Sequence, residues 1–244
     1  MTATDPGNYS TADWPILKRL CIPFVSRLRR AHRLFRLFPP MTCRTILDIG
    51  AFEGEFTEGA LAYFRPARVW LVEADPELAA ALRAKFQMEP ACRVVHAAIC
   101  DRPGEIEFRV NAHRPSSSLL PISSGTSGIF GLAMDEVRSV RVPALSLDDL
   151  FVRESLPEVD LMKVDIQGAE RLLIQGGRAA LRRVQCLYIE VLFEECYTGC
   201  ALFPEIHALL VESGFKLRLF YDCRRGTDGS MAYANALYFR PSAR

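Results

Sequence analysis

The stretch TILDIGAFEGE, residues 45–55, decides how this chain folds. It opens with an apolar run that ends in Asp48 and continues into a loop that carries Gly50 and Gly54. A buried strand that enters a glycine-bearing loop and then a helix is the place where open α/β sheets hold the adenosyl part of a cofactor. Residues 45–55 therefore predict a cofactor-binding turn between a strand and a helix.

The glycine spacing and the charge of this turn indicate which cofactor fits. A dinucleotide turn uses three glycines in the order G-x-G-x-x-G, so that backbone amides close on a pyrophosphate. Here the spacing is Gly50-x-x-x-Gly54, and the turn carries Asp48, Glu53 and Glu55 but no basic residue. Carboxylates repel a pyrophosphate and attract a cation. The turn therefore favours S-adenosylmethionine, which carries a sulfonium and an ammonium group.

A further acid ends the next predicted strand, RVWLVE at 68–73. Glu73 lies roughly where a carboxylate meets the ribose hydroxyls in nucleotide-binding βαβ units. We therefore assign five residues to the cofactor site: Asp48, Gly50, Gly54, Glu73 and Asp101, the last of which follows the stretch CRVVHAAIC. The alternative is that the glycines are ordinary turn residues and Glu73 is a solvated strand end.

Strand and helix patterns alternate from residue 44 onward. Strands are predicted at 44–49, 68–73, 92–100, 159–165 and 184–191, and helices at about 54–64, 76–86, 167–176 and 203–213. Such alternation implies a mostly parallel sheet with helices on both faces. Two β-rich stretches at 215–222 and 233–239 flank the turn-prone CRRGTDGS, so they predict an antiparallel hairpin at one edge.

The segment between two further extended stretches, 105–110 and 137–145, has no helical periodicity. It is long and rich in Ser and Gly, reading RPSSSLLPISSGTSGIFG. Long loops of this kind are lids or binding elements, or else plain surface. Both interpretations of the 112–136 loop stay open, and His113 at its start is the one histidine that we would test as a base.

The carboxyl ends of the predicted strands bring several acids to one edge, where ligands bind in open α/β sheets. Asp165 is our first candidate for orienting or deprotonating a hydroxyl acceptor, and Glu190 is the second. Lys163 points to the same face and can pair with a carboxylate. The alternative for Asp165 is an N-cap of the helix that follows. Mg²⁺ would need a third oxygen ligand that the sequence does not supply, so we predict no metal.

The first 40 residues differ in charge from the rest. They hold seven Lys or Arg against Asp5 and Asp13, a net charge of +5, which leaves −4 for the remainder. Apolar residues recur among the basic ones at near-helical spacing, and Pro23 divides the segment. We predict a basic amphipathic helical extension at 1–40 and one catalytic domain at 41–244. The extension either packs on the domain or on a second subunit in a homodimer, or it lies on an anionic membrane.

Composition narrows the possible functions and cellular locations of the protein. The 244 residues carry a net charge of +1 and are 50% hydrophobic, so neither disorder nor a nucleic-acid partner is indicated. The sequence has no apolar run long enough to span a bilayer, and its polar start MTATDPGNYS differs from a signal peptide. The eight cysteines form no C-x-x-C pair. We therefore expect a cytoplasmic protein with reduced thiols, in contact with the inner face of the membrane if the extension binds lipid.

Six stretches together resemble the FkbM-type methyltransferases: LDIGAFEGEF, LVEADP, SSSLL, LSLDDL, LMKVDIQGAE and LYIEVLFEECYTG. The resemblance implies a seven-stranded, Rossmann-like class I methyltransferase fold and S-adenosylmethionine as the methyl donor. It also implies O-methylation of a hydroxyl on a sugar or polyketide-like molecule. The family's cofactor positions correspond to Asp48, Gly50, Gly54 and Glu73, and its lysine-acid motif to Lys163, Asp165 and Glu170.

Two departures from the family bear on function. Phe52 and Glu53 stand where many relatives have a smaller, more polar pair, and the basic extension is not a general family feature. The extension makes a glycolipid or phosphorylated acceptor worth considering. Two other function classes stay open. One is a nucleotide-dependent oxidoreductase, which the missing third glycine opposes, and the other is a non-catalytic adenosyl-binding or membrane-associated protein.

Overall fold

The computed structural model describes residues 32–38, 40–126 and 135–241. Its strands are β1 (Thr45–Ile49), β2 (Arg68–Glu73), β3 (Cys92–His96), β4 (Ala98–Cys100), β5 (Gly104–Asn111), β6 (Glu136–Ser146), β7 (Val159–Val164), β8 (Val184–Leu192), β9 (Lys216–Arg225) and β10 (Met231–Phe239). The α-helices are α2 (Glu55–Phe64), α3 (Pro76–Lys85), α5 (Leu147–Arg153), α6 (Glu170–Gln175) and α7 (Phe203–Glu212). Two 3₁₀ turns are η1 (Arg114–Ser116) and η2 (Ala180–Arg183).

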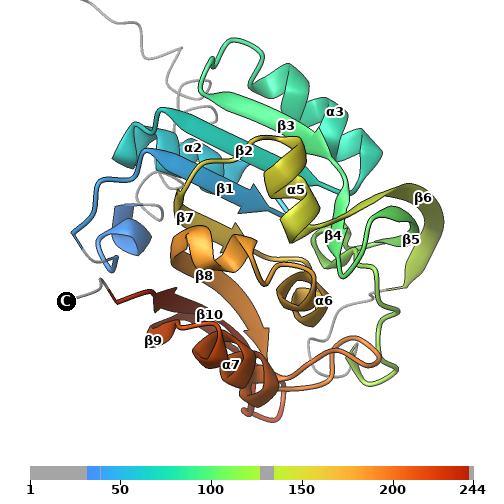
Figure 1. The fold of residues 1–244 in the computed structure, drawn as a ribbon. Coiled ribbons are helices and arrows are strands. Elements are labelled where there is room, and N and C mark those ends of the chain that lie inside the picture. The colour runs from blue at the N-terminus through green and yellow to red at the C-terminus, as the bar shows by residue number, and fades with distance from the viewer. Residues whose placement is uncertain (1–31, 39, 127–134, 242–244) are drawn as a thin grey trace, which may run out of the picture.

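A seven-stranded sheet forms the centre of the molecule (Figure 1). Its order is β3-β2-β1-β7-β8-β10-β9. The first five strands pair in parallel, whereas β10 runs antiparallel to both β8 and β9. The predicted α/β fold with an antiparallel C-terminal hairpin is confirmed, and the carboxyl ends of β1, β2, β7 and β8 share one edge.

Helices cover both faces of this sheet, because its central strands carry apolar side chains on both sides. On one face α5, α6 and α7 pack against residues such as Leu47 and Ile49 of β1. On the other face α2 and α3 pack against residues such as Ile46 and Leu161. Parallel strands that are buried on both sides need such two-sided cover, which explains the nearly unbroken apolar runs in the sequence.

The stretch 92–100, predicted as one strand, is two strands in different sheets. The chain leaves the large sheet at Ala97, whose N–H donates to the Glu73 carbonyl at 3.1 Å. β4 then pairs with β6 in a second, three-stranded sheet of order β4-β6-β5. The partner of β4 lies more than forty residues downstream, so local alternation gives no sign of the break. This small sheet carries η1 toward the carboxyl-terminal edge of the large sheet.

The described end of the predicted extension, residues 32–38, packs on the domain. Leu34, Phe35 and Phe38 are buried in the cluster that includes α2. The Phe35 ring contacts those of Phe56 and Phe64 at centroid distances of 5.5 and 4.8 Å. For these residues the packing interpretation holds. Residues 1–31 and 39 of the predicted extension lie outside the described part of the chain.

Replacing Phe35 by alanine should therefore destabilise the whole domain. Loss of a large buried aromatic side chain costs about 3 kcal/mol of unfolding free energy, and Phe35 is only 2% exposed. Urea unfolding of the full chain measures this change. Met88→Ala is the control, since Met88 is 87% exposed and should shift stability by less than about 0.5 kcal/mol. Equal stability of the two variants would mean that residues 32–38 contribute nothing to folding.

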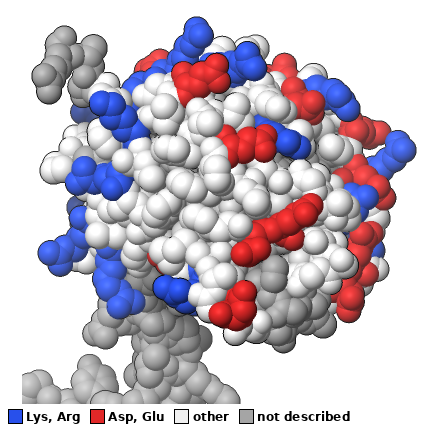
Figure 2. All heavy atoms as spheres, turned by 90° about the horizontal axis from the view of Figure 1, so that it is seen from below, with Lys and Arg blue, Asp and Glu red and all other residues white. Residues whose placement is uncertain are grey.

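On the face drawn in Figure 2, basic side chains line the left edge, and acidic side chains are more frequent toward the right. The edge strand β9 carries exposed basic residues, namely Lys216, Arg218, Arg224 and Arg225. Charged side chains on an edge strand disfavour pairing with another sheet.

None of the helices in the described ranges has the length and apolar character needed to cross a bilayer.

Candidate active site

A pocket of about 360 Å³ opens at the carboxyl ends of the parallel strands. Of the predicted site residues, Gly50, Glu73, Lys163, Asp165 and Glu190 line it. The described part of the 112–136 loop lines it too, through the run 113–117 and two later residues, Leu119 and Thr126. Segments from several strands and one loop therefore converge on a single cavity, whose size is typical of small-molecule sites.

Glu73 is fixed at one side of this pocket by backbone donors. Its carboxylate accepts the Phe52 N–H at 2.8 Å and the Asp75 N–H at 2.9 Å. Burial raises the pKa of Glu73, and these two hydrogen bonds act in the opposite direction. Each carboxylate oxygen has a second lone pair, so Glu73 can still accept hydrogen bonds from a ligand. Phe52, the unusual residue of the turn, acts here through its backbone, with φ at +49°.

Lys163 ties the glycine turn to β7. Its ammonium donates to the Gly50 carbonyl and lies 3.5 Å from Asp48 Oδ1 and 3.7 Å from Asp165 Oδ2. Burial lowers the pKa of Lys163, but the neighbouring carboxylates raise it more, so that the net shift is upward. The predicted pairing of Lys163 with a carboxylate is confirmed, and its charge is shared between two acids.

Gln167 joins the two candidate catalytic acids. Its Nε2 donates to Asp165 Oδ1 at 2.6 Å and to Glu190 Oε1 at 2.9 Å. The Tyr197 hydroxyl lies 2.6 Å from Gln167 Oε1 and holds the amide in this orientation. Burial, reinforced by the nearby Asp165 charge, raises the pKa of Glu190 well above its usual range. Asp165 and Glu190 therefore form one hydrogen-bonded unit in which Glu190 holds a proton more readily than an exposed glutamate does.

The alternative role of Asp165 as a helix N-cap is wrong. The N-cap of α6 is Ala169, and no side chain caps this helix. Glu170, the last member of the lysine-acid motif, is buried and accepts the Ile166 N–H at 3.1 Å. Burial raises the pKa of Glu170 to about 7. Glu170 thus supports the turn after β7, whereas Asp165 faces the pocket.

Three predicted cofactor residues do not line the pocket. Asp48 is completely buried behind the turn, where it accepts the Thr57 hydroxyl at 2.7 Å. Gly54 packs on Phe86, since a Cβ there would come within 2.7 Å of the ring. Asp101 is exposed in the turn after β4, beside Arg102. The first two residues shape the turn, Asp101 is not among the lining residues, and the part of all three in cofactor binding stays a prediction.

Asp75, Arg114 and Tyr197 also line the pocket, although they were not among the predicted site residues. Asp75 precedes Pro76 and caps α3, a signal that was readable from the sequence. Arg114 and Tyr197 come from other segments, and no local pattern marks them. In the described part of the chain no three His, Cys, Asp or Glu side chains converge as metal ligands.

The sheet order, with a ligand pocket at the carboxyl ends of β1, β2, β7 and β8, is that of the class I methyltransferases. The model of the methyltransferase FkbM domain matches residues 48–217, which include every pocket-lining segment except β10. This chain belongs to the FkbM methyltransferase family.

Known proteins are similar to this chain in sequence or in fold. The 2-O-methyltransferase NoeI of Sinorhizobium fredii (strain NBRC 101917 / NGR234) is 30% identical over 160 residues, which cover 63% of this chain and 65% of that protein. The N-terminal domain of EvdMO1 with SAH bound has a TM-score of 0.51 at 10% identity, covering 88% of this chain and 81% of that one. The structure of the same domain in the presence of SAH and D-fucose has a TM-score of 0.51 at 11% identity, covering 88% of this chain and 83% of that one. These structures share the fold with this chain.

Proposed function

We propose that this protein is an S-adenosylmethionine-dependent O-methyltransferase whose acceptor is a hydroxyl of a sugar, glycolipid or polyketide-like small molecule. One observation carries the proposal: a ribose-type carboxylate, Glu73, and an acid pair, Asp165 and Glu190, line the same pocket. The family assignment and the 2-O-methyltransferase relative support it. The cytoplasmic location, the membrane contact and the homodimer stay predictions from the sequence.

The residues of the turn fit S-adenosylmethionine. Gly50 brings the backbone so close to Asp165 that a Cβ would lie 1.9 Å from the Asp165 carbonyl oxygen, which leaves room only for a bare backbone. The Glu73 carboxylate can accept hydrogen bonds from the two ribose hydroxyls of the cofactor. The Asp165 carboxylate, which lines the pocket, suits a cationic ligand, whereas Glu53 and Glu55 of the turn are exposed.

When bound, S-adenosylmethionine supplies a methyl group on a positively charged sulfur. The chain's part is to hold the acceptor in line with that group and to accept a proton. Asp165 accepts the proton of the acceptor hydroxyl, and Gln167 fixes its carboxylate. Lys163 offsets the charge of Asp165 at 3.7 Å. Glu190, in its protonated form, orients a neighbouring oxygen of the acceptor.

The two other function classes find less support. An oxidoreductase would need a dinucleotide site, whereas the matching family model is that of a methyltransferase. A non-catalytic binding protein has no need of an acid unit in its cavity. Calorimetric titration with S-adenosylmethionine and SAH, with NAD as control ligand, tests the cofactor directly. A panel of p-nitrophenyl glycosides then tests the acceptor through release of SAH.

Glu73→Gln should weaken SAH binding by about one to two orders of magnitude, because a charge-assisted hydrogen bond contributes about 1.5 to 3 kcal/mol. The substitution keeps the size of the side chain and removes its charge. Calorimetry measures the effect, and Glu105→Gln is the control, since Glu105 is exposed on β5. Unchanged affinity in Glu73→Gln would take this carboxylate out of the cofactor site.

A further inference from the structure

The loop that begins with η1 is held to the pocket wall by two different kinds of contact. Neutral hydrogen bonds fix its later part: Ser118 Oγ donates to the Gln167 carbonyl at 2.7 Å, and Thr126 Oγ1 to the Cys196 carbonyl at 2.7 Å. On the Glu73 side the attachment is ionic and comes from Arg114. The loop is therefore attached to the pocket wall by an ion pair at its start and by neutral hydrogen bonds in its later part.

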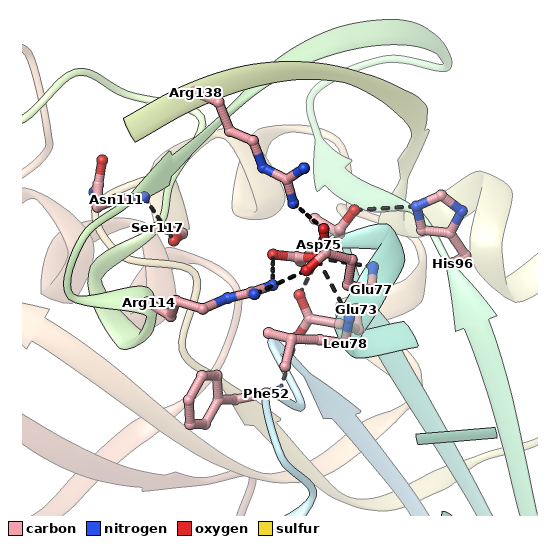
Figure 3. Close-up of polar contacts among 11 residues, drawn as sticks. Phe52, Glu73, Asp75, Glu77, Leu78, His96, Asn111, Arg114, Ser117 and Arg138 are labelled. Atoms are coloured by element: carbon pink, nitrogen blue, oxygen red, sulfur yellow. Dashed lines mark hydrogen bonds and ion pairs between the residues drawn. The ribbon is translucent and has the colours of Figure 1, made fainter. Parts of the chain in front are cut away.

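Arg114 reaches from η1 to two acids at the start of α3, as Figure 3 shows. Its guanidinium contacts Asp75 Oδ2 and lies 2.9 Å from Glu77 Oε2. The Asp75 side chain is only 1% exposed. A carboxylate buried to this degree needs a compensating charge. Within the described ranges Arg114 is the one cation that forms an ion pair with Asp75.

Asp75 connects Arg114 to the carboxylate expected to bind ribose. Its N–H donates to Glu73 Oε1 at 2.9 Å. Its own carboxylate accepts the N–H groups of Glu77 and Leu78 at 2.8 and 3.3 Å and thereby caps α3. One residue thus receives the guanidinium, begins the helix and orients Glu73. A shift of Arg114 would be transmitted to the pocket through a single backbone amide.

Resting on the proposed function, we propose that Arg114 is a positioning residue for the cofactor, which clamps η1 against α3 and fixes Glu73 through Asp75. The clamp closes the adenosyl side of the pocket with a charge-assisted contact, which is stronger than a neutral hydrogen bond. A bound nucleoside that hydrogen-bonds Glu73 is thereby held in part by this contact. The clamp should therefore act on the rate of dissociation more than on the rate of association.

The matched control lies in the same cluster. Arg138 of β6 contacts Glu77 (Figure 3), whose side chain is 56% exposed, and it does not touch Asp75. Arg138→Gln removes an ion pair of the same type from the surface, where such pairs contribute little. Arg114→Gln removes the pair that reaches the buried acid. The two variants therefore separate the clamp from a general loss of positive charge.

Stopped-flow binding of SAH to the full chain tests this proposal. Arg114→Gln should release SAH roughly tenfold faster, as expected for loss of one charge-assisted hydrogen bond, with association within about twofold of wild type. Arg138→Gln should stay within about twofold in both rates. Raising the salt concentration should speed release from the wild type and have little effect on Arg114→Gln, because salt screens the partly exposed pair.

Arg114→Lys covers the case in which Arg114→Gln does not fold. Lysine keeps the charge but cannot bridge two carboxylates, so release should be intermediate. Release at the wild-type rate from either variant would overturn the clamp, as would equal acceleration by Arg138→Gln. A wild-type protein that binds no SAH would overturn the proposed function and the clamp together. Binding by the wild type with unchanged rates in the Arg114 variants would overturn the clamp alone.

Discussion

Gly50→Ala is expected to abolish SAH binding and to destabilise the domain by more than about 4 kcal/mol. The added Cβ would lie 1.9 Å from the Asp165 carbonyl oxygen and 2.9 Å from its carbon, both backbone atoms. This carbonyl cannot turn away freely, because the N–H of the same peptide unit, that of Ile166, donates to Glu170 Oε1 at 3.1 Å. Relief would have to separate β1 from β7 where Lys163 bridges them.

Gly199→Ala is the control for this substitution. Gly199 has φ at +74°, nearly the same as the +72° of Gly50, but no atom lies within 4 Å of its ideal Cβ. Left-handed backbone alone costs about 1–2 kcal/mol for a residue with a Cβ. Thermal unfolding and SAH calorimetry of both variants separate strain from close approach. Equal losses in the two variants would mean that the backbone conformation, and not the contact with β7, requires glycine at position 50.

The order of strands and helices was predictable because each element carries its own period of apolar residues. The same period explains why Asp48 does not line the pocket. Side chains alternate along β1, so Asp48 lies on the face of Ile46, toward Thr57 of α2, while the pocket opens beyond the end of the strand. A carboxylate at a strand end is therefore not sufficient evidence of ligand contact. Its place in the alternation decides whether it supports the turn or lines the site.

Other features had no local signal. The ion pair between Arg114 and Asp75 joins residues 39 positions apart, and Tyr197 meets Gln167 across 30 positions. β4 leaves the large sheet to pair with β6, which depends on a segment far downstream. Strand ends can be assigned from the sequence because parallel topology places them together. Side chains that close the pocket from other segments become visible only when the tertiary structure is known.

Asp165→Asn should lower the rate of methyl transfer by about two to four orders of magnitude, the contribution typical of a general base, and should leave SAH affinity unchanged. Asparagine can still accept the Gln167 hydrogen bond through its side-chain oxygen, so the geometry of the unit is kept. What it loses is the ability to take up the proton of the acceptor hydroxyl. The measurement is single-turnover transfer to a glycoside that the wild type methylates, together with SAH calorimetry. Retained turnover would exclude Asp165 as the base.

Glu190→Gln separates the two acids of this unit. Because burial and the Asp165 charge raise the pKa of Glu190 well above its usual range, its side chain favours the neutral form. Glu190→Gln places a neutral amide of the same shape there, so it should lower the turnover rate by less than about tenfold, whereas Asp165→Asn should lower it far more. The reverse order would exchange the roles, with Glu190 as the base and Asp165 as its partner. The ratio of the two losses thus identifies the proton acceptor even though Gln167 holds both carboxyl groups.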